Sequence, residues 1–235
     1  MKFKFKLIPT TMTIIMVIFM VSLGVWQLFR LNTKLDIIND IKKKIDRPVV
    51  TATCKELNKK FDDKEDIFYS KVKISGTVKA DQILFLYSGP IQFKGEPGYR
   101  LLAPLKCKDG DYLVADIGWI PLKEKDKYKK DYNLKLTGGI LEGEKKKMFT
   151  PTNDVEHNVW YYISPKEIGK HFKINVKDFY VMKAYENNIP PIGKDISLNI
   201  RNDHLGYAFT WFGMAIALLI IFLEYSRRLA KNERV

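Results

Sequence analysis

His204 is the residue whose type and position in this sequence indicate chemistry most directly. It lies in the motif 202–205, where an uncharged apolar run begins. An ionisable side chain is costly within hydrocarbon, whereas an imidazole at the water boundary can bind an amphipathic ligand at little cost. The residues alone leave two interpretations open. The imidazole hydrogen bonds to lipid headgroups, to Asp203 or to a neighbouring domain, or it is an axial ligand of a haem iron.

Side chains near His204 suit the second interpretation. Tyr207 and Trp211 follow on the same helical face, where they could flank a porphyrin. Arg201 and Arg30 lie at the outer ends of two apolar runs, where their guanidinium groups could bind propionates. The alternative for both arginines is anchoring at the membrane interface.

A second cluster lies towards the end of the first apolar run. We expect Trp26 to anchor at the interface, and we also count it among the candidate cofactor contacts. We expect Gln27 to hydrogen bond across to the other helix. Small residues on one face of the second run predict that a neighbouring helix approaches closely. They are Gly206, Thr210, Gly213 and Ala217.

Two uncharged apolar runs, 7–29 and 205–223, indicate a membrane protein. Residues 7–29 carry no charge and would span roughly 34 Å as a helix, slightly more than the ~30 Å hydrocarbon core. We expect a transmembrane helix there rather than a cleaved signal peptide, because the run is long and lacks a small-residue cleavage site. The predicted organisation is a cytoplasmic tail (1–6), a transmembrane helix (7–29), a periplasmic β-rich domain (30–204), a second transmembrane helix (205–223) and a cytoplasmic tail (224–235).

Charges beside the two runs predict the orientation. Basic residues precede the first run and follow the second, so both termini are expected in the cytoplasm. The central segment then faces the periplasm, since long translocated domains escape the charge rule. No mitochondrial presequence is recognisable, which favours a bacterial inner membrane. The flanking charges are Lys2, Lys4, Lys6, Arg227, Arg228, Lys231 and Arg234.

The net charge of +13 would suggest nucleic-acid binding in a soluble protein. Here the lysines are spread along the chain without a recognition motif, and nucleic acid is not an expected partner. Short lysine runs such as 145–147 are typical of solvated loops, with attraction to anionic headgroups or an acidic partner as the alternative. Cys54 and Cys107 are too distant in sequence for a CxxC motif, and the sequence leaves their pairing open.

Period-two patterns between the two runs predict an α+β domain with a mainly antiparallel sheet. The first apolar run is expected to continue as a helix until Pro48, and Asp109-Gly110 is expected to close a hairpin. The expected strands are 67–74, 77–78, 83–87, 99–106, 112–119, 134–142, 159–163 and 179–184, with short helices at 52–61 and 165–172.

Hydrolytic catalysis has little support in the motifs. The three histidines, His157, His171 and His204, lie outside G-x-S-x-G, H-E-x-x-H and Cys–His signatures. A phosphate-binding glycine loop is also lacking. We therefore expect a protein that is not an enzyme.

Four motifs occur in order along the chain. They are Gly24-x-Trp26-Gln27-x-x-Arg30, Gly118-Trp119-Ile120-Pro121, Asn158-Val159-Trp160 and Asn202-Asp203-His204-Leu205-x-Tyr207-Ala208-x-Thr210-Trp211-Phe212. Together they resemble the signatures of the Surfeit locus 1 family, which are membrane assembly factors for cytochrome c oxidase. The resemblance covers nearly the whole chain, and the last motif is the most specific. Ile117 and Thr33 depart from the family pattern, which often has a basic residue and a tryptophan there.

The resemblance implies a role in maturing the catalytic subunit of a haem-copper oxidase. Haem a would be a transient cargo received from haem a synthase, with His204 as the ligand of its iron. Membrane lipid is a further expected partner. Two alternatives remain: a haem-independent scaffold that stabilises an oxidase assembly intermediate, and an envelope enzyme of unknown activity.

Overall fold

The computed structural model describes residues 3–89, 96–196 and 202–232. The chain divides into two compact units. The first, the helical unit, is formed by Met1–Asp40 and Leu198–Val235, and the second, the β domain, by Ile41–Ser197.

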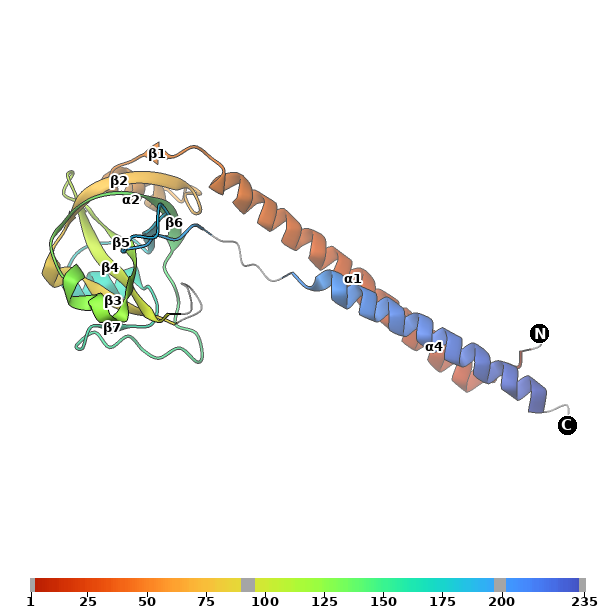
Figure 1. Cartoon of the computed structure of the whole chain (residues 1–235). Coiled ribbons are helices and arrows are strands. Elements are labelled where there is room, and N and C mark those ends of the chain that lie inside the picture. Colours follow the sequence, from red (N-terminus) through yellow and green to blue (C-terminus); the bar gives the residue numbers. More distant parts are fainter. Residues whose placement is uncertain (1–2, 90–95, 197–201, 233–235) are drawn as a thin grey trace. The chain divides into compact units, whose positions relative to one another are not determined.

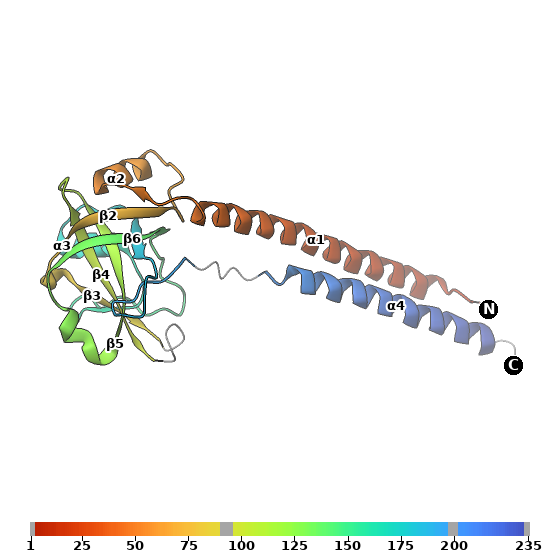
Figure 2. The same cartoon turned by 45° about the horizontal axis from the view of Figure 1, so that its top comes forward.

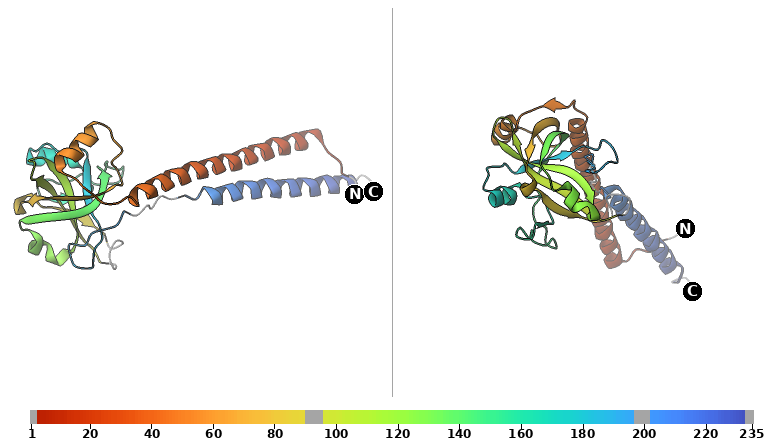
Figure 3. Two further views of the ribbon diagram at one scale, coloured as in Figure 1. Left: turned by 90° about the horizontal axis from the view of Figure 1, so that it is seen from above. Right: turned by 60° about the vertical axis from the view of Figure 1, so that its left-hand side comes forward.

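Two long helices dominate the helical unit. They are α1 (Leu7–Ile45), whose last residues belong to the β domain, and α4 (His204–Asn232). Both are long and apolar enough to cross a membrane, and only 11% of an apolar 18-residue stretch in each helix is buried. They run antiparallel and side by side, as the two views in Figure 3 show. This confirms the predicted pair of helices at the two ends of the chain.

The first helix continues well beyond its apolar run, as the spacing of its apolar residues predicted. It ends at Ile45, close before Pro48, whose ring disfavours helical geometry in the preceding residue. Ile41 is buried within this extension. The helix is therefore 39 residues long, about 58 Å at ~1.5 Å per residue, or nearly twice the ~30 Å hydrocarbon core.

The β domain is built on one sheet whose strands close into a barrel (Figures 1 and 2). The ring runs β2–β6–β8–β5–β4, and pairing of β2 with β4 completes it. Most pairings are antiparallel; β1–β2, β3–β7 and β5–β8 are parallel. The strands are β1 (Val50–Thr51), β2 (Lys71–Val78), β3 (Leu84–Ser88), β4 (Gly98–Cys107), β5 (Tyr112–Pro121), β6 (Tyr132–Glu142), β7 (Val159–Trp160) and β8 (Phe179–Lys183).

Four helical segments decorate the barrel. Thr53 starts α2 with a capping box, because its hydroxyl accepts from Glu56 N and the Glu56 carboxylate accepts from Thr53 N. Ser164 caps α3 in a similar way, accepting from Glu167 N. The segments are α2 (Cys54–Asp62), η1 (Ala80–Gln82), η2 (Leu122–Tyr128) and α3 (Pro165–Phe172).

Several local expectations were wrong. Residues 67–70 form a turn rather than strand, with Tyr69 at a φ of 64° while its N–H still bonds to Ile140 O. The expected strand at 159–163 shortens to β7, and β1 and η2 were not predicted at all. Each error lies where tertiary pairing overrides a short local pattern.

Two apolar cores stabilise the sheet. The barrel interior is filled by side chains from one face of every ring strand, including Ile74, Leu101 and Val181. The opposite face of β3, β4, β5 and β8 packs beneath α3 and β7, where Trp160 is fully buried. A disulfide joins Cys54 at the start of α2 to Cys107 at the end of β4, which settles the pairing that the sequence left open.

Candidate functional site

His204 is the first residue of α4, and the structure brings it against α1. Its Nδ1 atom lies 2.7 Å from Oε1 of Gln27, which confirms that Gln27 hydrogen bonds across to the other helix. Both side chains are partly buried within the helical unit. The polar pair thus joins two helices that are otherwise packed through apolar and small residues.

This pair lies in a seam between α1 and α4. The seam is formed by the less exposed residues of each helix, which recur at three- and four-residue intervals. The same spacing characterises antiparallel helices that pack knobs into holes. Gly24 permits the close approach, since a Cβ there would lie 2.6 Å from Cε1 of Phe212. On α1 the less exposed residues include Thr13, Val17, Met20, Gly24, Gln27, Leu31 and Lys34, and on α4 they include His204, Ala208, Trp211, Ala215, Leu218, Phe222 and Ser226.

The small-residue stripe predicted on the second helix does not line this seam. A Cβ on Gly206 or Gly213 would meet open space, and Thr210 and Ala217 are exposed. The face was misjudged because Ala208 and Ala215, which are buried, lie on a different side of α4. The stripe therefore does not face α1, and a different face of α4 contacts that helix.

The contact with Gln27 fixes the chemistry of the imidazole. An amide oxygen can only accept a hydrogen bond, so the tautomer that matches this contact has the proton on Nδ1 of His204 and the lone pair on Nε2. Within the described residues, Nε2 takes part in no hydrogen bond. Metal-bound histidines commonly have this arrangement, in which an acceptor on one nitrogen orients the other towards the metal. The residues present therefore fit an imidazole ligand for iron.

Other candidate residues lie away from this pair. Trp26 is 50% exposed, and the guanidinium of Arg30 lies 5.7 Å from its ring centroid, so these two side chains contact each other. Tyr207 is 52% exposed and off the seam, whereas Trp211 lies on it. Arg201 falls outside the described residues. Of the predicted set, His204 shares its seam with Trp211 alone.

Gln27 is the hydrogen-bond partner of His204, and the sequence reasoning did not include it among the candidate cofactor contacts. It predicts a bond from Gln27 to the other helix but no role in orienting the histidine. A signal was available, because an amide side chain within an apolar span is expected to find a polar partner on a neighbouring helix. What the sequence did not specify was which polar group on α4 that partner would be.

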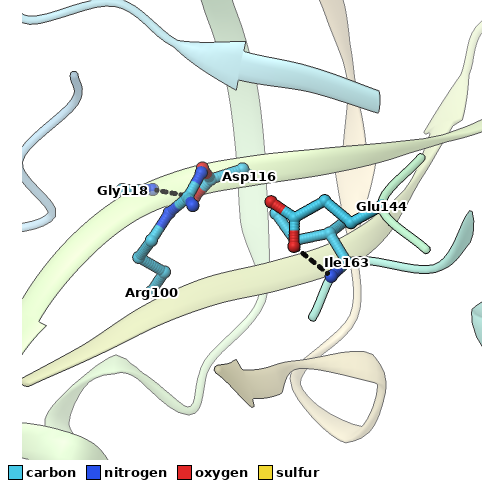
Figure 4. Close-up of polar contacts among 5 residues, drawn as sticks. All are labelled: Arg100, Asp116, Gly118, Glu144 and Ile163. Carbon is cyan, nitrogen blue, oxygen red and sulfur yellow. Dashed lines mark hydrogen bonds and ion pairs between the residues drawn. The ribbon is translucent and has the colours of Figure 1, made fainter. Parts of the chain in front are cut away.

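A second polar cluster lies within the β domain (Figure 4). Arg100 on β4 and Asp116 on β5 form a buried ion pair through Nη2 and Oδ2. The other carboxylate oxygen of Asp116 accepts from Gly118 N at 3.2 Å, across the bulge that interrupts the β4–β5 register. The carboxylate therefore bonds to both strands, which indicates a structural role in holding the bulge.

Burial and neighbouring charges shift the pKa values of this cluster. Burial alone lowers the pKa of Arg100, but the attraction of Asp116, Tyr180 and Glu144 together raises it above its ordinary value. Burial raises the pKa of the Tyr180 phenol, and Arg100 offsets this only in part. Tyr180 is thus neutral and Arg100 charged throughout the physiological pH range.

The remaining family-like motifs also serve packing. Gly118 has a φ of 124°, and a Cβ there would lie 2.7 Å from Ile192 O, so only glycine fits. Asn158 bonds to the start of β3 and to the residue before it: its Oδ1 accepts from Phe85 N at 3.3 Å and its Nδ2 donates to Ile83 O at 2.9 Å. Both residues therefore hold peripheral segments against the barrel.

Titratable groups also gather at a surface depression of about 780 Å³ between α2 and the β4–β5 hairpin. Lysines there, such as Lys55 and Lys173, stand among carboxylates such as Asp62 and Asp111. The barrel interior is instead a packed apolar core. An envelope enzyme would consequently have to place its chemistry on the outer surface.

Comparison with known proteins places these features in a family. A model described as "SURF1 family" matches residues 14–216. A SURF1-like protein of Rickettsia prowazekii is 32% identical over 224 residues, covering 88% of this chain and 85% of that one. Surfeit locus protein 1 of Gallus gallus is 25% identical over 233 residues, covering 89% of this chain and 72% of that one. The chain belongs to the SURF1 family.

Proposed function

We propose that this protein assists the assembly of a haem-copper terminal oxidase, cytochrome c oxidase, by holding haem a transiently before its insertion into the catalytic subunit. Family membership supports the role in oxidase assembly. The His204–Gln27 contact carries the proposal for haem, because it leaves Nε2 of the imidazole as the available nitrogen. When bound, the cargo would supply an iron that accepts this lone pair.

A single imidazole suits a carrier better than two strong ligands, since the cargo must be released. Gln27 would orient the ring and keep Nδ1 protonated. Trp211, about two helical turns further along the same seam, offers an aromatic surface on the same side of α4. The haem a synthase is the proposed donor and the oxidase catalytic subunit the proposed acceptor.

The proposed location is the bacterial inner membrane, with both termini in the cytoplasm and the β domain in the periplasm. Two helices able to span a bilayer and relatives from Rickettsia support the membrane. Basic residues beside both helices support the orientation. The Cys54–Cys107 disulfide supports it further, because disulfides persist in oxidising compartments such as the periplasm.

The test is to purify the full chain from cells that also express haem a synthase, and to record absorbance spectra. Wild type is expected to carry haem and His204→Ala to lose it. His171→Ala, which alters an exposed histidine on α3, is the matched control and should retain the pigment. Equal haem occupancy in wild type and His204→Ala would remove the ligand assignment.

Variants at Gln27 test the orienting role separately. Gln27→Met keeps a similar volume but loses the acceptor, so haem affinity should fall by about 10- to 100-fold. Gln27→Glu keeps an acceptor and should bind haem more tightly than Gln27→Met. Equal affinity in wild type and Gln27→Met would show that the contact serves helix packing alone.

A haem-independent scaffold is the second candidate. It is favoured by the exposed Trp26 and Tyr207, whose positions off the seam suit contacts with a partner helix as well as with lipid. A scaffold would capture the oxidase subunit equally well with His204→Ala, and no pigment would co-purify with wild type. Pull-down and spectra from the same preparations therefore separate the two candidates.

A further inference from the structure

The loop that leaves β6 carries two large apolar side chains in an unusual setting. Met148 and Phe149 are 89% and 94% exposed, the highest values among the large apolar side chains described in the β domain. They are adjacent in sequence and directly follow three exposed lysines, Lys145, Lys146 and Lys147. We call residues 145–149 the basic-apolar tip. Exposing two adjacent large apolar side chains to water is unfavourable, so this pair indicates a contact surface.

The tip projects from a fixed base. Glu144 N donates to Ile163 O at 2.7 Å, and Ile163 N donates to Oε2 of Glu144 at 3.0 Å (Figure 4). Next to it, Gly143 N donates to Asp178 O at 3.0 Å. These bonds attach the start of the loop to the second core. Glu144 is the acidic residue nearest to the tip in sequence, and its carboxylate accepts one of these bonds from backbone.

Bonds within the loop shape the tip itself. Thr150 N donates to Lys147 O at 3.0 Å, which turns the chain at Met148 and Phe149. Nζ of Lys146 donates to Oγ1 of Thr152 at 2.6 Å. The two apolar side chains at this turn are therefore held almost fully exposed.

The surface beside the tip has a matching character. A depression of about 260 Å³ is lined by Lys145, Lys147, Thr150, Tyr161, Tyr162 and Glu144, whose carboxylate accepts from Ile163 N. Tyr161 is 40% exposed, so an amphipathic ring adjoins the two ammonium groups. Exposed apolar side chains flanked by lysines and an aromatic ring are the combination that binds the headgroup region of an anionic bilayer.

From this combination we infer that the basic-apolar tip binds the surface of an anionic membrane. Met148 and Phe149 enter the boundary between headgroups and acyl chains, and Lys145, Lys146 and Lys147 bind lipid phosphates. A free phosphate would satisfy the lysines but not the two apolar side chains. A bilayer is also always available, since the β domain is connected in sequence to α1 and α4, both able to span one. The inference does not depend on haem binding.

The test uses full-length protein in lipid nanodiscs and an environment-sensitive fluorophore attached to Phe149→Cys. The two native cysteines are joined, so the introduced thiol is the only reactive one. With phosphatidylglycerol in the bilayer, the emission should shift to the blue and be quenched by lipids that carry a spin label. Asp81→Cys, at an exposed turn of the β domain, is the control and should keep water-like emission.

The dependence of membrane binding on charge provides a second measurement. Polybasic residues near an anionic surface contribute about 1 kcal/mol each, so changing one lysine of the tip to glutamine should lower the bound-to-free ratio about fivefold. Nanodiscs of phosphatidylcholine alone should show weaker quenching than anionic ones. Water-like emission at position 149 in every bilayer would overturn the inference. So would protection that arises only when the oxidase subunit is added, because that result would assign the tip to a protein partner.

Discussion

The β domain and the helical unit use their polar groups in opposite ways. In the β domain, Arg100, Asp116 and Asn158 bond to partners within the fold and hold a bulge or a loop in place. In the helical unit, His204 bonds to Gln27 through one nitrogen, and that bond orients the other. Polar groups of one chain thus divide into those that hold the β domain together and a pair that joins two long helices. Each prediction below changes one side of this comparison.

The largest effect is expected from breaking the buried ion pair of the β domain. Arg100→Met leaves the Asp116 carboxylate buried without its cation, which should lower the free energy of unfolding by about 3–5 kcal/mol. Denaturant titration of the full chain in detergent, followed by near-ultraviolet circular dichroism, measures this change.

A double variant provides the control for that experiment. Arg100→Met combined with Asp116→Leu removes both charges, so much of the lost stability should return. If Arg100→Met alone unfolds with the wild-type midpoint, the pair does not hold the bulge and the comparison loses its clearest case.

Loss of the disulfide should have the next largest effect. Cys54 and Cys107 are separated by 53 residues, and replacing both with alanine should destabilise the β domain by about 2–4 kcal/mol. Thermal unfolding of oxidised wild type, reduced wild type and the double variant measures it. Reduced wild type and the variant should agree, and an unchanged midpoint in both would contradict the expected contribution.

The helical unit should respond to overpacking of its seam. Gly24→Leu forces the ring of Phe212 away and should weaken the helix pair by about 1–3 kcal/mol, without changing the unfolding midpoint of the β domain. Hydrogen exchange at the first amides of α4 should accelerate. Gly213→Leu is the matched control, since that position faces open space. Equal exchange in the two variants would show that the seam is misplaced.

The smallest effect concerns acid stability. Burial would raise the pKa of Asp109, but hydrogen bonds from the backbone N–H groups of Lys55 and Asp111 lower it below its ordinary 3.8. A lowered folded-state pKa adds stability above pH 3.8 that is lost as pH falls through the folded value. Asp109→Asn should therefore be less stable than wild type at pH 7 by under about 1 kcal/mol, with the gap closing as the pH falls below 3.8. A gap that widens in acid would contradict the assignment.

The sequence predicted the elements that periodicity can specify. Both long helices, the strands around Leu101, Val114 and Ile140, and α3 lie where expected, because each shows a sustained three-to-four or alternating apolar pattern. The extension of α1 to Ile45 was also predicted from such spacing.

Features that depend on tertiary contact escaped prediction. The two-residue strand β1 has no pattern of its own, β7 is shorter than the strand expected at 159–163, and the Cys54–Cys107 pairing required the barrel to bring distant segments together. At the candidate site, His204 was predicted as a ligand from its position at a span boundary, and this stays a prediction. The contact with Gln27 needed the rotation of both helices, which depends on Gly24 and Phe212 and not on a motif.

The closed ring of strands also limits strand pairing between neighbouring copies of this protein. An unpaired strand edge can template pairing with another chain, and natural sheets shorten such edges to suppress it. Pairing of β2 with β4 joins the ring, and the described strands that terminate the sheet order, β1 and β7, are two residues each. Neighbouring molecules thus find little exposed strand backbone to pair with, which lowers the tendency of copies of this protein to aggregate.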